Sequence, residues 1–300
     1  MPLPQPPSPP PLPRIGVVIV TMGTRPRELA ALLASVERQD VPARRVVLVG
    51  NATPLTEVDT DATKLPLTEN LGCPGGRNAG LRLLREAGDV DVVVELDDDG
   101  LLIADDVFRQ VQQRFARDPR LGVVGFRVAD ENGHTERRWV PRLRADDPLR
   151  GGPVTAFLGG GHAFSMAMLR QIGLWPAEFF FGHEESDLAW RALDAGWTIL
   201  YAPDLVLQHP RTSPARHAVY HRFTARNRVW LARRRLPAAL VPAYLGLWSL
   251  LMTARLRSPA ALKAWWGGFF EGLGTPCGPR GPMSWRTVWR MTRLGRPPIL

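Results

Sequence analysis

The sequence predicts an α/β fold with a mostly parallel central sheet, on three observations. Short runs of β-branched, nearly uncharged residues are typical of strands buried on both faces, and they alternate with segments whose leucines share one helical stripe. Such alternation implies right-handed crossovers, with ligands bound at the carboxyl ends of the strands. Three consecutive aspartates follow one predicted strand, so chemically active side chains lie at such an end.

The first half of the chain contains most of the predicted sheet. Ile15–Thr21 is expected as the first strand because it is β-branched and uncharged. Residues 25–38 are expected as a helix because Leu29, Leu32 and Val36 share one stripe. Further strands are expected at 46–49, 65–67, 90–96 and 121–128, and further helices at 76–87 and 105–117.

The second half has fewer regular patterns. Helices are expected near 166, at 184–195 and at 217–235, and a strand at 197–201. Residues 236–254 carry no charged side chain. The length of this stretch is just enough to span a hydrocarbon core of about 30 Å as a helix. Two prolines and a glycine interrupt this stretch, so we expect an interfacial hairpin with the next apolar stretch, 258–273, rather than a transmembrane helix. Two helices packed on the α/β domain are the alternative.

Charge is divided unevenly along the chain. The formal net charge is +9, but residues 209–300 carry +15 and the first 208 residues carry −6. Six of the ten tryptophans fall in the basic part, and Arg with Trp beside apolar segments is the pattern of a membrane interface. We therefore expect an anionic membrane surface as a partner. No RNA-binding signature, zinc spacing or basic recognition helix accompanies the charge, so nucleic acid is not expected.

The cysteines and the first residues indicate the cellular setting. Cys73 and Cys277 have no neighbour at metal or redox spacing, which argues against a disulfide framework or a zinc site and fits a reducing cytoplasm. Residues 1–14 include eight prolines and lack the apolar stretch of a signal peptide, so we expect a disordered leader. The chain is thus divided into this leader, a domain at 15–235 and a helical extension at 236–300.

The aspartate triplet is the first candidate site. Adjacent side chains on a strand point to opposite faces, so Asp97 and Asp99 can converge while Asp98 turns toward another partner. Converging carboxylates suit a divalent metal held against a phosphate. An acidic turn that caps the following helix is an equally good interpretation of the triplet alone.

Five short motifs in order resemble the family 2 glycosyltransferases of the GT-A fold, especially the bacterial rhamnosyl- and galactofuranosyl-transferase-like branch. The resemblance covers roughly residues 15–235, and its joint order is more specific than any single motif. The motifs are Val18-Ile19-Val20-Thr21 with Arg25-Pro26, the segment 69–80 (ENLGCPGGRNAG), Leu96-Asp97-Asp98-Asp99, the segment 184–188 (EESDL) with Arg191 and Gly196, and His209 with Arg226-Asn227.

The resemblance implies a metal-dependent enzyme that uses a nucleoside-diphosphate sugar. Departure of the diphosphate creates negative charge, which a divalent cation stabilises, and hard oxygen ligands suit Mg²⁺ or Mn²⁺. Asp99 is the first candidate ligand and Asp97 the second, with contact to the metal or the ribose. The resemblance adds His209, and an imidazole in the set favours Mn²⁺.

Donor binding is expected at a glycine-rich segment and at the strand ends. The glycines of residues 72–78 would let backbone amides at a helix N-terminus approach phosphate or ribose, with Arg77 supplying charge. A tight strand-to-helix connection in which Asn78 caps the helix is the alternative. The candidate donor-binding residues, from the motifs and the resemblance, are Thr21, Arg25, Asn51, Gly75, Gly76, Arg77, Asn78, Asp97 and Asp98.

The acceptor hydroxyl needs a general base, and the adjacent acids Glu184 and Glu185 are the candidates. The resemblance assigns the role to Glu185. The preceding Phe179-Phe180-Phe181 run could shield the carboxylate and raise its pKa. Glu184 is expected on the acceptor side, or as a first-turn acid that favours the helix dipole. The resemblance also implies that Gly160, Gly161 and His162 lie beside the acceptor sugar.

One position departs from the family pattern. Gly50 stands where many relatives carry an aspartate that helps to read a pyrimidine base. The identity of the donor base is therefore open, and Asn51 is expected to take over part of the contact.

These observations predict an inverting enzyme that transfers a hexosyl or deoxyhexosyl group. The basic, Trp-rich tail suggests a saccharide or lipid-linked acceptor, and work at the cytoplasmic face of the cell membrane in cell-surface polysaccharide synthesis. Two other classes remain open, a metal-dependent nucleotidyltransferase and a noncatalytic membrane scaffold. The nucleotidyltransferase would share the carboxylates but would not need the base at Glu185.

Overall fold

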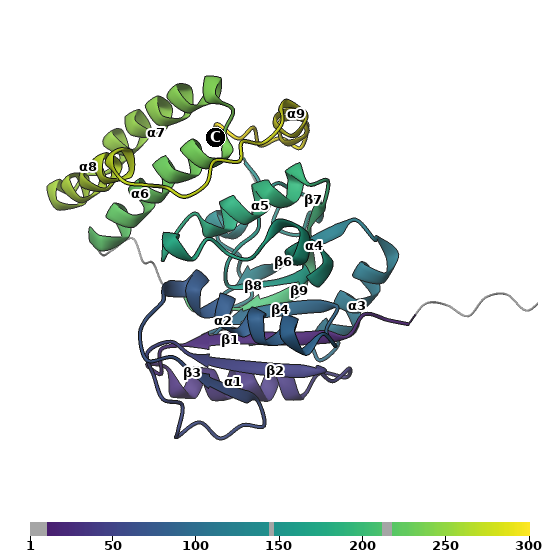
Figure 1. The fold of residues 1–300 in the computed structure, drawn as a ribbon. Coiled ribbons are helices and arrows are strands. Elements are labelled where there is room, and N and C mark those ends of the chain that lie inside the picture. The colour runs from purple at the N-terminus through teal and green to yellow at the C-terminus, as the bar shows by residue number, and fades with distance from the viewer. Residues whose placement is uncertain (1–10, 144–146, 212–217) are drawn as a thin grey trace, which may run out of the picture.

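A computed structural model describes residues 11–143, 147–211 and 218–300, and the α/β class predicted from the sequence is confirmed. Within this part, nine strands form one sheet in the order β3-β2-β1-β4-β8-β6-β9-β5, with β7 paired to β9 (Figure 1). The strands are β1 Ile15–Thr21, β2 Arg45–Gly50, β3 Thr63–Pro66, β4 Val92–Asp97, β5 Leu101–Leu102, β6 Leu121–Ala129, β7 Gly152–Pro153, β8 Gly161–Ser165 and β9 Thr198–Gln208.

The sheet is mixed. β3, β2, β1 and β4 form a parallel block, as their apolar, uncharged sequences predict, and β6 is parallel to β9. β8 joins these blocks by pairing antiparallel with β4 and with β6. The sequence predicts no strand here, because Gly161–Ser165 is short and contains a glycine, a histidine and a serine. Pairing on both sides, and not local propensity, makes it a strand.

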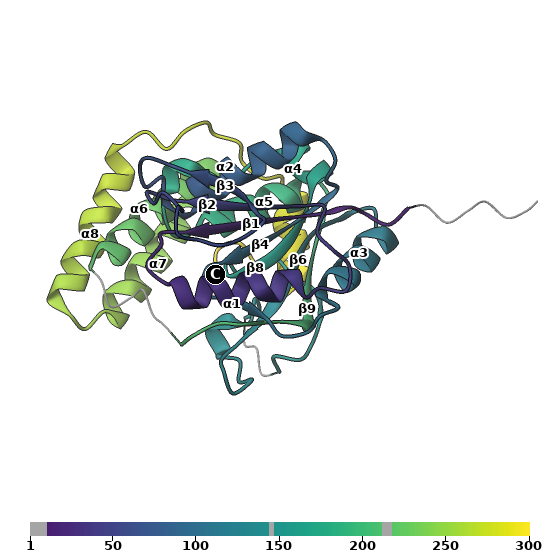
Figure 2. The same cartoon turned by 90° about the horizontal axis from the view of Figure 1, so that it is seen from below.

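Helices cover both faces of the sheet (Figure 2). Alternate residues of β1 point to opposite faces, so Val17 and Ile19 pack with α1 and α3, whereas Val18 packs with α2, α4 and α5. The helices are α1 Pro26–Glu37, α2 Gly72–Ala87, α3 Val107–Arg117, α4 Met166–Ile172, α5 Glu184–Asp194, α6 Ala218–Arg235, α7 Val241–Arg255, α8 Pro259–Gly274 and α9 Trp285–Arg293, with short 3₁₀ turns at Arg137–Trp139, Ala177–Phe179 and Ala238–Leu240.

The last four helices form a group beside α5, away from β1, β2 and β3 (Figure 1). α6 and α8 pack closely because Gly268 and Gly272 of α8 face the α6 backbone: a Cβ at Gly268 would lie 2.1 Å from the Arg222 carbonyl oxygen. α7 is largely exposed, with Tyr244 as its buried residue. The sequence analysis did not predict α9, which is short and buries Thr287 and Met291, one turn apart.

The predicted leader is partly outside the described residues. Residues 1–10 lie outside the described part of the chain, and the disorder expected there stays a prediction. Pro13 and Arg14 are held to the domain: the Pro13 carbonyl accepts a hydrogen bond from Gln112, and Arg14 pairs with Asp91 at 2.9 Å. The last residues of the predicted leader therefore contact the α/β domain.

Two neighbouring glycines of α8 give a first prediction. Gly268→Ala should lower the free energy of unfolding by about 1–3 kcal/mol, because the new methyl group overlaps the α6 backbone. Gly267→Ala is the control: its Cβ meets nothing within 4 Å, and alanine favours a helix interior by up to about 1 kcal/mol. Chemical denaturation of both variants measures the two effects. Equal effects of the two substitutions would contradict close α6–α8 packing.

Candidate active site

A cavity of about 420 Å³ opens at the carboxyl ends of β1, β2 and β4. Thr21 ends β1, Asn51 follows β2 and Asp97 ends β4, so three neighbouring parallel strands deliver polar side chains to one place. Its lining residues are Val20, Thr21, Met22, Thr24, Arg25, Asn51, Asn70, Gly72, Cys73, Asp97, Asp98, Phe180, Phe181, Val219, Tyr220 and Phe223.

The three aspartates have different partners. Asp97 accepts a hydrogen bond of 2.7 Å from Arg77. Asp98 accepts one of 2.6 Å from the Thr21 hydroxyl and one of 3.2 Å from Arg25. Asp99 pairs with Arg25 at 2.7 Å and with Nε2 of His209 at 3.1 Å. The chain therefore uses Asp98 to fix Thr21, while Asp97 and Asp99 turn toward His209.

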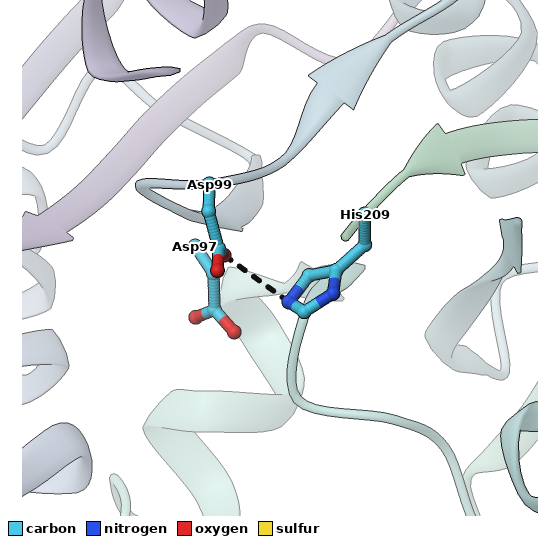
Figure 3. Close-up of side chains that lie close together, drawn as sticks. All are labelled: Asp97, Asp99 and His209. Carbon is cyan, nitrogen blue, oxygen red and sulfur yellow. Dashed lines mark ion pairs between the residues drawn. The ribbon is translucent and has the colours of Figure 1, made fainter. Parts of the chain in front are cut away.

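Asp97, Asp99 and His209 form a group that fits a divalent metal (Figure 3). One ligand atom from each lies within 4.8 Å of the others. Two carboxylates and an imidazole suit Mn²⁺, and carboxylate oxygens also suit Mg²⁺. His209 directly follows β9, so the group joins strand ends that lie more than 100 residues apart in sequence.

Charge within the group sets its protonation. Burial alone would raise the pKa of Asp99, but the hydrogen bond and charge of His209, together with Arg25, hold it below its usual value. Burial likewise opposes protonation of His209, and Asp99 outweighs it, so the pKa of His209 is raised. Asp98 behaves differently: burial raises its pKa despite the Thr21 and Arg25 hydrogen bonds.

The glycine-rich segment is not the phosphate-binding loop that the sequence predicted. α2 begins at Gly72, so Gly75 and Gly76 lie inside the helix. The Gly72 amide donates to Asn70 Oδ1 at 2.8 Å, the Cys73 amide donates to the Phe180 carbonyl at 3.0 Å, and Pro74 has no amide hydrogen. These first-turn donors are therefore not free for a phosphate. Gly76 serves packing, since a Cβ there would lie 2.8 Å from Val20.

Arg77 and Asn78 are buried in the protein. Arg77 is 2% exposed and joins Asp97 to the Gly159 carbonyl, with its Nη1 atom unpartnered. Asn78 donates to the Trp175 carbonyl and accepts from the Trp175 amide, at 2.9 and 3.0 Å. Asn78 thus neither caps α2 nor faces the cavity. The donor-binding prediction is wrong for Asn78, whereas Arg77 contacts the site at Asp97 and at the Gly159 carbonyl.

His162 does not lie at a surface that an acceptor sugar could reach. It is fully buried in β8, where its ring bonds Glu95 Oε2 at 2.9 Å and the Leu158 carbonyl at 3.1 Å. The Gly160 carbonyl accepts from the Asp97 amide at 3.2 Å, and Gly161 starts β8. The acceptor-side prediction is therefore wrong for His162, whereas Gly160 lies beside the metal-ligand group.

Glu185 also lies close to this glycine segment. A Cβ at Gly159 would lie 2.6 Å from Glu185 Oε1, and a Cβ at Gly160 would lie 3.7 Å from Asp97 Oδ2. The carboxylate of Glu185 and the metal-ligand group therefore lie beside two adjacent glycines. Burial raises the pKa of Glu185.

Glu184 is buried and its Oε2 atom has no hydrogen-bond partner. Burial and then the charge of Glu185 raise its pKa to about 8. In the unfolded chain the pKa of the Glu184 carboxyl is near 4.3. Between about pH 4.3 and 8 the native protein therefore binds one more proton than the unfolded chain, at Glu184. The stability contribution of Glu184 is therefore fully present at low pH and is lost as pH rises through this window.

Substitution of Glu184 by glutamine tests this titration. We expect the free energy of unfolding of Glu184→Gln, relative to the parent protein, to rise steadily from pH 5 to pH 8, because glutamine mimics the neutral acid. Chemical denaturation at several pH values measures the difference, with exposed Glu86→Gln as the control. A difference that does not change with pH would contradict a raised pKa at Glu184.

An aromatic wall closes the cavity opposite the aspartates, and the sequence analysis missed most of it. Phe180 and Phe181 come from the loop before α5, and Tyr220 and Phe223 from the first turns of α6. Asn227 fixes this loop, because its amide nitrogen donates to three loop carbonyls at 2.8–2.9 Å. The i, i+3 spacing of Tyr220 and Phe223 was the available signal.

Gly50 and Asn51 shape the base of the cavity. A Cβ at Gly50 would lie 2.3 Å from the Thr53 carbonyl oxygen, so this turn excludes any side chain at position 50. Asn51 lines the cavity, but its amide donates to Asn70 and its carbonyl accepts from the Leu71 amide, both at 2.9 Å. Asn51 therefore holds the 70–72 segment, and only its spare acceptor capacity is open to a ligand.

Comparison with known proteins places the chain in one family. A family model described as "Glycosyltransferase like family 2" matches residues 13–235, most of the chain. No curated protein sequence gives a significant match.

Solved structures share the fold at low identity. GalNAc-T7 with UDP, GalNAc and Mn²⁺ has a TM-score of 0.60 at 16% identity, over 87% of this chain and 54% of that chain. The mannosyltransferase PcManGT from Pyrobaculum calidifontis, with GDP-Man and Mn²⁺, has a TM-score of 0.56 at 21% identity, over 98% of this chain and 88% of that chain. TarS 1-349 from S. aureus, with UDP-GlcNAc, has a TM-score of 0.60 at 15% identity, over 87% of this chain and 80% of that chain. The chain thus spans about half of the GalNAc-T7 chain, and the likeness shows the fold.

Proposed function

The chain belongs to the glycosyltransferase-like family 2, and we propose that this glycosyltransferase is a metal-dependent, inverting enzyme. It would move a hexosyl or deoxyhexosyl group from a nucleoside-diphosphate sugar to a hydroxyl of a saccharide or lipid-linked acceptor. One observation carries the proposal: a metal-ligand group and the partly buried carboxylate of Glu185 lie beside two adjacent glycines, next to a nucleotide-sized cavity.

On the donor side, Asp97, Asp99 and His209 would hold Mn²⁺ or Mg²⁺. When bound, the metal would supply positive charge next to the departing diphosphate. Arg25 bridges Asp98 and Asp99 at the mouth of the cavity and is about half exposed, so its guanidinium can also contact phosphate. Neighbouring folds that contain Mn²⁺ with UDP or GDP-Man support this choice of ligand.

On the acceptor side, Glu185 would remove the proton of the attacking hydroxyl. Its raised pKa brings a carboxylate closer to the operating pH, where a general base works best. Attack in line with the departing diphosphate inverts the anomeric carbon. Nuclear magnetic resonance of the anomeric proton in the first product tests this: we expect the configuration opposite to the donor's, and retention would overturn the inverting mechanism.

The nucleoside of the donor is contacted differently from that of relatives with an aspartate at position 50. The turn at Gly50 has no space for that side chain, whereas the Phe180, Phe181 and Tyr220 rings line the cavity. We propose that apolar and stacking contacts replace the missing hydrogen bond to the base. Competition by UDP, GDP and dTDP in a binding assay would rank the bases.

A metal-dependent nucleotidyltransferase is the rival enzyme class. It would use the carboxylate group but would release pyrophosphate instead of a nucleoside diphosphate. A noncatalytic scaffold is the other rival, and it predicts that Asp99→Ala and Glu185→Gln keep full biological activity. The raised pKa of Glu185 and its position beside Gly159, one residue from the glycine next to Asp97, favour the transferase over both.

We further propose that the enzyme works at the cytoplasmic face of the cell membrane, in synthesis of cell-surface polysaccharide. Ala238–Arg255 is the one helical segment in the described part of the chain that is long and apolar enough to cross a membrane, and 6% of it is buried. Leu250 and Phe270 are 70% and 63% exposed. Exposed Arg255, Arg257 and Lys263 lie between them in sequence, which favours an interfacial position on anionic lipid.

Vesicle sedimentation tests the membrane proposal. We expect binding to phosphatidylglycerol vesicles and weaker binding to phosphatidylcholine vesicles, with Leu250→Glu and Phe270→Glu each reducing it. Leu149→Glu, at an exposed leucine of the α/β domain, is the control and should bind normally. Absence of binding to either vesicle would overturn the membrane proposal and leave the transferase proposal intact.

A further inference from the structure

A second, smaller cavity lies where α5, α6 and α7 meet the residues that follow α9. Its volume is about 80 Å³, and it shares no lining residue with the active-site cavity. Polar or charged lining comes from Thr155, His183, Ser186, Arg228, Trp248 and Arg296. No acidic side chain is among its described lining residues.

Three of the residues that line this cavity each have one buried polar side-chain atom without a hydrogen-bond partner. The atoms are Oγ1 of Thr155, Nε of Arg228 and Nε1 of Trp248, half of all such side-chain atoms in the described residues. Thr155 is 2% exposed. Buried polar groups in native proteins are nearly always satisfied, so three unmet groups around one cavity indicate a bound polar ligand.

The charge of the cavity favours an anion. Arg228 stacks over the Trp248 ring at 3.7 Å and donates to the Tyr244 hydroxyl at 3.1 Å, and neither it nor Arg296 forms an ion pair in the described chain. Burial lowers the pKa of Arg296, and the nearby charge of Arg228 lowers it further. Burial and the two guanidinium groups also lower the pKa of His183. Arg228 and Arg296 are both partly exposed, and an anion would supply the opposite charge that water alone does not.

We propose that this cavity binds a small oxyanion of the phosphate type. The Arg228 and Trp248 N–H groups and the Thr155 hydroxyl would donate to its oxygens, and Arg296 would supply the second positive charge. The volume exceeds the 10–15 Å³ needed for one water several-fold, which leaves room for a small anion. The ligand would connect the C-terminal helices to the residue preceding Glu184 and Glu185.

Thermal unfolding and calorimetric titration with inorganic phosphate test the proposal. We expect phosphate to raise the melting temperature of the full chain above its value in sodium chloride of equal ionic strength, with saturable binding. Glycerol 3-phosphate, a soluble analogue of a lipid headgroup, identifies the source: tighter binding than phosphate indicates a lipid, and equal or weaker binding indicates the free ion.

Variants assign the binding to this cavity. Arg228→Gln and Arg296→Gln should each weaken phosphate binding at least about tenfold, the loss typical of one charge-assisted contact. Exposed Arg293→Gln is the matched control, and Arg25→Gln removes binding at the active site; both should keep the phosphate effect. Thr155→Val should fold as well as the parent without phosphate, since it removes an unmet hydroxyl, and should bind phosphate more weakly.

Two results would overturn the proposal. One is an equal melting temperature in phosphate and in chloride. The other is a phosphate effect that survives in Arg296→Gln and Thr155→Val but disappears in Arg25→Gln, which would place the only anion site at the donor diphosphate.

Discussion

Asp99→Asn is expected to lower donor-dependent release of nucleoside diphosphate by at least about 100-fold, the usual cost of losing one group that stabilises developing charge. Asp99 is the member of the triplet that contacts both His209 and Arg25, so its loss removes a metal ligand and frees two cationic groups. A coupled assay for UDP or GDP at saturating Mn²⁺ measures the loss.

The matched control is an acid of the same type outside the site. Asp204→Asn changes an exposed carboxylate that pairs with Arg114, and its activity should equal that of the parent. Isothermal titration of Mn²⁺ in the presence of the nucleoside diphosphate should show weaker binding to Asp99→Asn alone. Normal activity of Asp99→Asn would remove the metal group from the mechanism.

Glu185→Gln should lower kcat by about 10²–10⁴, the range for loss of a general base, while donor binding stays nearly unchanged. Glutamine keeps the shape of the side chain beside Gly159 but cannot accept a proton. Steady-state kinetics with a competent acceptor, together with a donor-binding titration, separates the two effects.

Glu178→Gln is the control for this substitution, because Glu178 lies before α5 and pairs with Arg234 away from the cavity. It should retain the parent's kcat. If Glu185→Gln instead weakened donor binding and left kcat intact, the base would have to be another group, and neighbouring Glu184 would be examined first.

Periodicity predicted the parts of the fold that local sequence determines. The parallel strands β1, β2 and β4 have long β-branched runs, and α1 and α3 have clear apolar stripes. β8 and α9 were missed because their residues carry little pattern, and long-range contacts decide their structure. The strand around 197–201 was predicted too short, since Pro203 and Asp204 interrupt its pattern while pairing with β6 continues.

The site was predictable where strand ends fix the direction of side chains. Alternation on β4 correctly separated Asp98 from Asp97 and Asp99, and the three now have distinct partners. The glycine-rich segment was misinterpreted because glycine permits helix–strand packing as readily as close approach to a ligand. His162 and Asn78 were misplaced for a similar reason: buried polar partners such as Glu95 and Trp175 come from distant segments and leave no local signal.

The most direct test of a metal-dependent glycosyltransferase is product release from a panel of sugar nucleotides with Mn²⁺ or Mg²⁺, with membrane acceptors present. We expect nucleoside diphosphate release from at least one donor, abolished by a chelator and restored by added metal. Release of pyrophosphate instead, or no release from any donor, would contradict it.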